Sequence, residues 1–123
     1  MSFCTSIHCM DGRIQEPIIN FLKQNLSVKY IDTITEPGPC KILAEQNSKT
    51  LLNSILARVS ISVEKHGSNL IAVSGHYDCA GNPCTEDKQK TQIQESVNYL
   101  KSLYPDKKII GFWITDEWKI SPL

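Results

Sequence analysis

Residues 70–79 read LIAVSGHYDC, and this stretch indicates how the chain folds. Its first half, residues 70–74, is a short apolar run typical of a buried strand. Its second half begins a polar loop that continues to residue 83. Further short runs rich in apolar or β-branched residues occur at residues 3–8, 28–35 and 109–114. The sequence therefore predicts four strands.

Hydrophobic residues recur at helical spacing between each pair of consecutive strands. They are Ile14, Ile18 and Leu22; Leu52, Ile55, Leu56, Val59 and Val63; and Ile93, Val97, Leu100 and Tyr104. We expect the second helix to end near Gly67, because glycine commonly follows a helix C-terminus, and the third to end before Pro105.

The alternation of four strands with three helices predicts a single α/β domain over residues 1–123. The simplest doubly wound arrangement has three layers: a mainly parallel four-stranded sheet of order 2-1-3-4, with helices on both faces. This order places the first and third strands side by side at the topological switch point. Ligands of such sheets bind beyond the carboxyl ends of these strands, so we expect the functional site there.

The composition argues against several classes of partner. The 123 residues include 13 Lys or Arg and 13 Asp or Glu, so no basic surplus favours nucleic acid or an anionic membrane. No apolar run approaches the roughly 18–20 residues that span a bilayer, and the first residues do not resemble a signal peptide. We therefore expect a cytoplasmic protein whose five cysteines are core residues or metal ligands rather than disulfide partners.

His76 and Cys79 are separated by two residues, a spacing that lets one loop turn both side chains toward one metal ion. Cys9 follows the first strand, so the predicted sheet brings it to the same crevice. Two thiolates and one imidazole suit zinc better than magnesium or calcium, and three protein ligands leave one tetrahedral position for water. Taken singly, a buried cysteine is commonly a small core residue. The convergence at the switch point favours a zinc site.

Asp11 and Arg13 lie on the turn that follows Cys9. The arginine fork matches a carboxylate, so this pair can hold Asp11 ionised and in one orientation, able to accept a hydrogen bond from a water on the metal. The alternative is an aspartate that caps the following helix, with a solvated arginine beside it.

Together these residues resemble the β-class carbonic anhydrases. Cys9-Met10-Asp11-Gly12-Arg13 is similar to the C-x-D-x-R motif of that family, and Gly75-His76-Tyr77-Asp78-Cys79 is similar to its H-x-x-C motif. The chain departs from the family at Gly12, where serine or threonine is usual, at Ala80, where glycine is usual, and in the Glu36-Pro37-Gly38-Pro39 stretch. It resembles a compact, divergent member.

The resemblance implies a zinc-dependent lyase that reversibly hydrates carbon dioxide to bicarbonate by a zinc-bound hydroxide. It implies zinc ligands Cys9, His76 and Cys79, a catalytic pair Asp11 and Arg13, and a homodimer or higher homo-oligomer. The alternative interpretation is a non-catalytic or differently specific zinc-binding protein of the same fold. No contact with nucleic acid or membrane is expected in either case.

The remaining cysteines and histidines have weaker signals. Cys84 lies five residues after Cys79, near enough to compete for the metal, although a loop cysteine is the expected interpretation. Cys40 and Cys4 are expected in the core. His8 neighbours Cys9 but points to the opposite face of the strand, so we do not expect it to be a ligand. Trp118 is expected either in the core or at a subunit interface.

Overall fold

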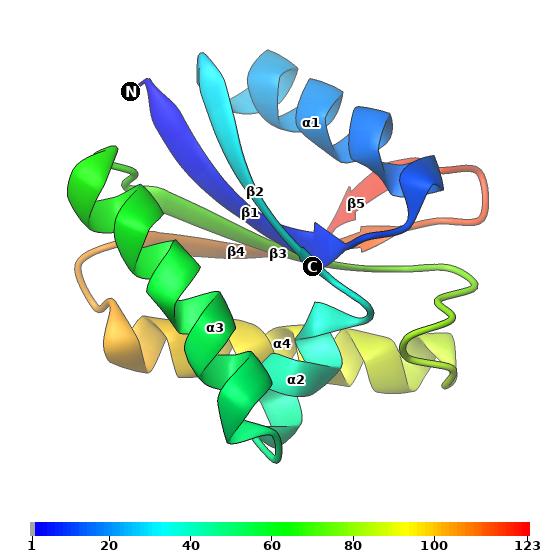
Figure 1. The fold of residues 1–123 in the computed structure, drawn as a ribbon. Helices are drawn as coiled ribbons and strands as arrows, with labels where there is room; N and C mark the ends of the chain where they lie inside the picture. The colour runs from blue at the N-terminus through cyan, green and yellow to red at the C-terminus, as the bar shows by residue number, and fades with distance from the viewer. Residues whose placement is uncertain (1) are drawn as a thin grey trace.

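The computed structural model describes residues 2–123 and contains a five-stranded sheet of order β2-β1-β3-β4-β5 (Figure 1). The first four strands are parallel, which confirms the predicted order 2-1-3-4 and the α/β class. Their bounds are β1 Phe3–Cys9, β2 Tyr30–Glu36, β3 Leu70–His76 and β4 Lys108–Ile114. The predicted count of four was wrong, because the chain turns back after β4 and adds the antiparallel β5, Ile120–Pro122.

Helices cover both faces of this sheet, as predicted. Figure 1 shows α1 (Gly12–Leu26) on one side and α2, α3 and α4 on the other. The bounds of the latter three are Pro39–Glu45, Lys49–Ser60 and Glu86–Leu103, and a π-helical turn, Ile61–Lys65, extends α3. The short α2 was not predicted. Among residues 2–123, no helix combines the length and the apolarity that a membrane crossing requires.

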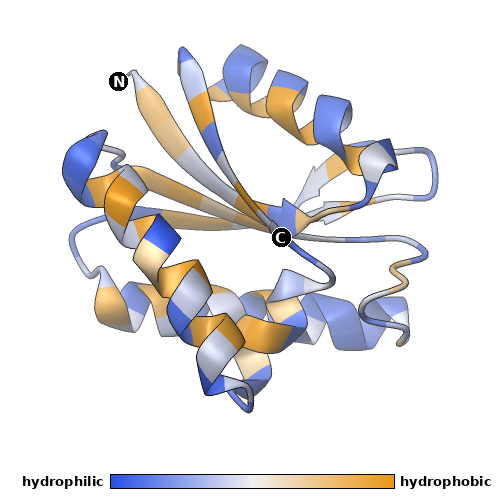
Figure 2. Cartoon of the chain, in the orientation of Figure 1, coloured by the Kyte–Doolittle hydropathy of each residue, from blue (hydrophilic) through white to orange (hydrophobic). Residues whose placement is uncertain are grey.

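The side-chain alternation of the strands divides the core into two layers. Ile7, Ile71 and Val73 belong to the cluster under α2, α3 and α4, while Cys4 and Ala72 belong to the cluster under α1. All seven residues of β3 are buried, as expected for a central strand covered on both faces. Figure 2 shows hydrophobic residues on the helix faces that meet the sheet. The helical spacing in the sequence therefore identified the faces that pack.

Two glycines allow a close approach between the turn after β2 and the loop after β3. A Cβ on Gly81 would lie 2.5 Å from the carbonyl carbon of Pro37, and a Cβ on Gly38 would lie 2.8 Å from the backbone oxygen of Gly81. Gly38 also has φ of +60°, a conformation that favours glycine. The loop that carries His76 and Cys79 is thereby packed directly against the chain leaving β2.

Candidate metal centre

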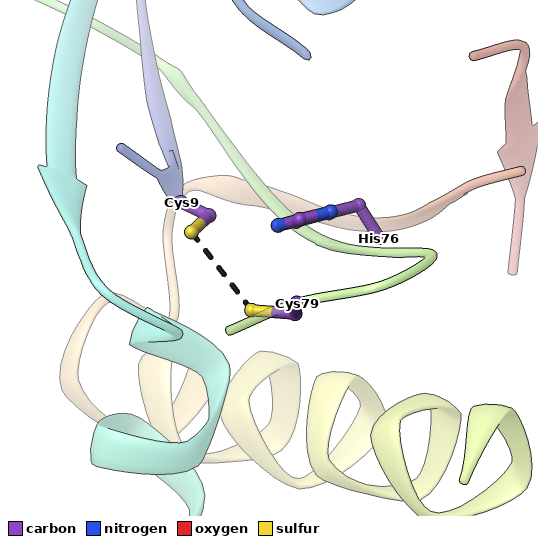
Figure 3. A group of neighbouring side chains, drawn as sticks. All are labelled: Cys9, His76 and Cys79. Atoms are coloured by element: carbon purple, nitrogen blue, oxygen red, sulfur yellow. Dashed lines mark hydrogen bonds between the residues drawn. The ribbon is translucent and has the colours of Figure 1, made fainter. Parts of the chain in front are cut away.

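The structure brings Cys9, His76 and Cys79 together at the carboxyl ends of β1 and β3 (Figure 3). One potential ligand atom from each residue lies within 4.8 Å of the other two, and all three residues are buried. The two sulfurs are 3.8 Å apart. Cys9 ends β1, His76 ends β3, and Cys79 follows in the loop. The predicted switch point is therefore where these three side chains meet.

The hydrogen bonds of His76 leave one ring nitrogen available. Nδ1 lies 2.7 Å from the backbone oxygen of Tyr77, and because a carbonyl can only accept, Nδ1 carries the proton. Nε2 then presents a lone pair, and it is buried without a hydrogen-bond partner among the described residues. A buried polar atom without a partner is rare in proteins. Its position beside two cysteine sulfurs suits a metal ligand.

The thiol of Cys79 donates a hydrogen bond to the sulfur of Cys9. The hydrogen bond from Cys79 lowers the pKa of Cys9, and the same contact, together with burial, raises the pKa of Cys79. These shifts favour a thiolate at Cys9, and a cation bound here would displace the proton of Cys79 as well. Two sulfurs and one imidazole nitrogen form a donor set that zinc prefers, so the residues present fit this metal.

Asp11 and Arg13 form the predicted ion pair, and Asp11 also has the alternative role of helix cap. Asp11 Oδ1 accepts a hydrogen bond of 2.9 Å from the backbone N–H of Arg13 at the start of α1. Arg13 Nη2 donates to Asp11 Oδ2 at 2.7 Å. This guanidinium contact lowers the pKa of Asp11 to about 2, so the carboxylate is ionised at neutral pH.

A cavity of about 220 Å³ opens beside the cluster. Its lining residues come from the end of β1 and the turn after it, from the turn after β2, and from the loop after β3. They are Cys9, Met10, Asp11, Pro37, Ala80 and Gly81. Most of these side chains are apolar, and Asp11 contributes the charged group. The cavity can therefore admit a small molecule with few polar atoms.

Two glutamines that the sequence analysis did not identify support the ligand-bearing backbone. Gln15 Nε2 donates to the carbonyl oxygens of Cys9 and Asp11 at 2.9 and 2.8 Å. Gln89 Nε2 donates to the carbonyl oxygen of His76 at 3.0 Å. Gln89 lies one helical turn before Ile93, on the buried face of α4. A polar residue at this position of an apolar stripe indicates a buried hydrogen bond, so the sequence did contain a signal for its role.

His8 is fully buried and its hydrogen bonds explain it without a metal. Gln15 uses its amide N–H groups on the backbone, so its Oε1 accepts from His8 Nε2 at 2.8 Å, and His8 Nδ1 then accepts from Ser6 Oγ. Burial lowers the pKa of His8, which favours this neutral ring.

Cys40 and Cys84 lie outside the cluster, which among the described residues contains only the three side chains above. The sulfurs of Cys40 and Cys84 both contact the side-chain amide of Asn82, at 3.7 and 3.4 Å. Burial raises the pKa of Cys40 to about 12, so its thiol stays protonated. Cys84 therefore lies outside the cluster of potential metal ligands, in agreement with its interpretation as a loop cysteine.

The comparisons with known proteins point to one family. The family described as "Putative carbonic anhydrase" matches residues 1–123. No curated protein matches the sequence.

Solved structures with a similar fold include carbonic anhydrases from fungi. The carbonic anhydrase from Glaciozyma antarctica is 19% identical with a TM-score of 0.63, over 96% of this chain and 80% of that one. The β-carbonic anhydrase CafD of Aspergillus fumigatus is 13% identical with a TM-score of 0.61, over 100% and 90%. A tetrameric β-carbonic anhydrase from Sordaria macrospora is 11% identical with a TM-score of 0.55, over 98% and 79%. At these identities the likeness establishes the fold alone.

Proposed function

The chain belongs to the Putative carbonic anhydrase family, and we propose from this premise that it is a zinc-dependent lyase that reversibly hydrates carbon dioxide to bicarbonate. In this proposal Cys9, His76 and Cys79 bind the zinc. The observation that carries the proposal is that three buried potential ligand atoms meet at one point. One of them, His76 Nε2, has no hydrogen-bond partner among the described residues, and the ionised Asp11 lies in the same site.

When bound, zinc supplies Lewis acidity, which makes a water molecule a stronger acid near neutral pH. Two thiolates reduce the charge of the ion, so the protein must contribute more to this effect than in an all-histidine site. Asp11 provides an ionised acceptor at the cavity wall. Arg13 keeps that carboxylate ionised and holds it in one orientation through the contacts of Nε and Nη2.

The cavity supports carbon dioxide over a larger polar substrate. Met10, Pro37 and Ala80 offer apolar surface, and the volume of about 220 Å³ lies below the roughly 300–1,000 Å³ typical of drug-sized ligand sites. A hydrolase that uses the same metal would need room and polar partners for its substrate, and apart from Asp11 the side chains that line this cavity provide few.

A homo-oligomer is part of the same proposal. A solved neighbour of the same fold is described as tetrameric. Here β2 is an edge strand whose Tyr30 is half exposed, and Ile61 of the neighbouring π-helical turn is more than half exposed. Hydrophobic residues at a free sheet edge favour pairing with another chain. Light scattering coupled to size exclusion measures the assembly directly, and a monomer at micromolar concentration would contradict this part of the proposal.

The metal assignment is tested by zinc content after purification. We expect one zinc per chain in the wild type, loss of that zinc in Cys79→Ser, and retention in the matched control Cys84→Ser, whose thiol faces Asn82. Equal zinc in both variants would refute the ligand set.

Catalysis is tested by stopped-flow hydration of carbon dioxide. Asp11→Asn keeps the shape of the side chain and its capacity to cap α1, but not its charge, so we expect zinc content to persist and kcat to fall by about 10–100-fold. The exposed Asp106 provides the control Asp106→Asn, with wild-type kcat expected. A zinc-loaded wild type no faster than buffer would instead support a non-catalytic zinc protein.

A further inference from the structure

Arg13 contacts three separate segments of the chain. Its Nε and Nη2 groups donate to the carboxylate of Asp11 at distances from 2.7 to 3.2 Å. Its Nη2 and Nη1 groups donate to the backbone oxygen and the carboxylate of Asp78 at 3.1 and 3.3 Å. The guanidinium carbon Cζ lies over the ring of Trp118, 4.6 Å from its centroid.

The contact with Asp11 alone does not explain this fixed position. The side chain of Arg13 is 45% exposed. An exposed arginine samples many rotamers, and an exposed ion pair restrains it only weakly. The Asp78 carboxylate is itself 69% exposed, so the packed ring of Trp118 near the C-terminus is the further contact that best defines where the guanidinium lies.

The backbone of these two residues is unusual in the same way. Four non-glycine residues among residues 2–123 have positive φ, and two of them, Ser27 and Gln46, end helices, where this conformation is common. The other two are Asp78 and Trp118, with φ of 56° and 61°. Aspartate is among the non-glycine residues that adopt this conformation most readily, whereas a bulky residue such as Trp118 adopts it only where its surroundings impose it. Both such residues contact Arg13.

The β4–β5 hairpin imposes the conformation of Trp118. The backbone N–H of Trp118 donates to the carbonyl oxygen of Thr115 at 2.9 Å, and the N–H of Thr115 donates to the carbonyl oxygen of Lys119 at 2.9 Å. The indole also packs against the core layer under α1, together with Ile120. The hairpin thus places one aromatic face on Arg13, although the hairpin contains none of the proposed ligands.

We propose that Trp118, aided by Asp78, is a positioning residue that holds Arg13 and through it the Asp11 carboxylate at the metal centre. The assignment rests on the proposed function for its effect on turnover. Its physical basis, the restraint of Arg13, does not depend on turnover and is measured separately.

The restraint is measured by NMR on the Arg13 Nε–H, whose exchange with water is slow when it is held in a hydrogen bond. We expect Trp118→Leu to accelerate this exchange and Trp118→Phe to retain slow exchange, because an aromatic face remains under the cation. Thr85→Ala removes the cap of α4, on the other face of the sheet, and serves as the control for a general loss of stability. Unchanged exchange in Trp118→Leu, or equal acceleration in Thr85→Ala, would overturn the proposal.

Turnover provides the second arm. We expect Trp118→Leu to lower kcat by about tenfold at unchanged KM and zinc content, with recovery in Trp118→Phe. In an Asp11→Asn background, Trp118→Leu should cause no further loss, because both changes act on one unit. Additive losses, or wild-type kcat in Trp118→Leu, would overturn the positioning role. If the Arg13 Nε–H exchanges slowly in a wild-type protein that does not hydrate carbon dioxide, the result would support the restraint and contradict the proposed function.

Discussion

The close approach of Gly81 to Pro37 permits a quantitative prediction for Gly81→Ala. The added Cβ would lie 2.5 Å from the carbonyl carbon of Pro37, 2.6 Å from its Cβ and 2.8 Å from the backbone nitrogen of Gly38. Ordinary carbon–carbon contacts are about 3.5–4.0 Å, so the two segments must separate by about 1 Å. Two of these three obstructing atoms are backbone, which cannot rotate away as a flexible side chain would.

Overpacking of this kind typically costs about 1–3 kcal/mol, and the rigid neighbours place Gly81→Ala near the upper end. Alanine also reduces the entropy of the unfolded chain, which returns about 0.4–1 kcal/mol. We therefore expect a net loss of about 2 kcal/mol in the free energy of unfolding and, for a domain of this size, a fall in Tm of about 6–10 °C. Because Cys79 lies two residues away, zinc affinity should fall as well.

Urea unfolding of the zinc-free protein measures the first effect, and zinc titration with a chelator competitor measures the second. Gly12→Ala is the matched control: a Cβ there meets nothing within 4 Å, and alanine favours the helix that begins at this residue. If Gly81→Ala unfolds at the same urea concentration as Gly12→Ala, the packing argument is wrong.

Three other predictions concern the supports of the site. The contact with Arg13 holds the pKa of Asp11 at about 2, below its unfolded value of about 3.9, so its contribution to stability is complete above about pH 4 and is lost as pH falls toward 2. Asp11→Asn should therefore show a shallower loss of stability between pH 4 and 2, measured as urea midpoints of zinc-free protein; equal slopes would contradict the ion pair. Gln89→Leu removes the donor to the His76 carbonyl and should cost about 1–3 kcal/mol and weaken zinc binding about tenfold, measured by urea unfolding and chelator competition. Thr85 caps α4, because its Oγ1 accepts a hydrogen bond from the backbone N–H of Lys88. Thr85→Ala should therefore lower the free energy of unfolding by about 1 kcal/mol, measured in thermal melts followed by circular dichroism.

The sequence predicted the central sheet because its signals are local. Each of the four parallel strands is a short run rich in apolar or β-branched residues, and right-handed crossovers then leave few possible orders. The missed elements lack such signals. β5 has three residues and includes Pro122, and its pairing depends on the turn between Thr115 and Lys119. α2 has seven residues, too few for a periodic pattern, and it begins at Pro39, where proline indicates a turn as readily as a first helical position.

Spacing and topology were sufficient to predict the meeting of Cys9, His76 and Cys79, because the carboxyl ends of adjacent parallel strands lie at one edge of a sheet. The neighbours that fix Arg13 and the ligand-bearing backbone were not predictable in the same way. Asp78 and Trp118 are 65 and 105 residues away from Arg13 along the chain. They reach it only through the conformations of a loop and a hairpin that no local pattern specifies.

The separation of the proposed ligands along the chain has a consequence for biosynthesis. Cys9 and Cys79 are 70 residues apart, so zinc at this centre closes a long loop. By the chain-entropy relation for cross-links, a loop of that length stabilises a folded chain by about 4 kcal/mol. A nascent chain can pair β1 with β2 early, but it has no second or third ligand until β3 and its loop have been synthesised. If zinc binds as proposed, scarcity of the metal limits the amount of protein that survives to maturity as well as the activity of each molecule.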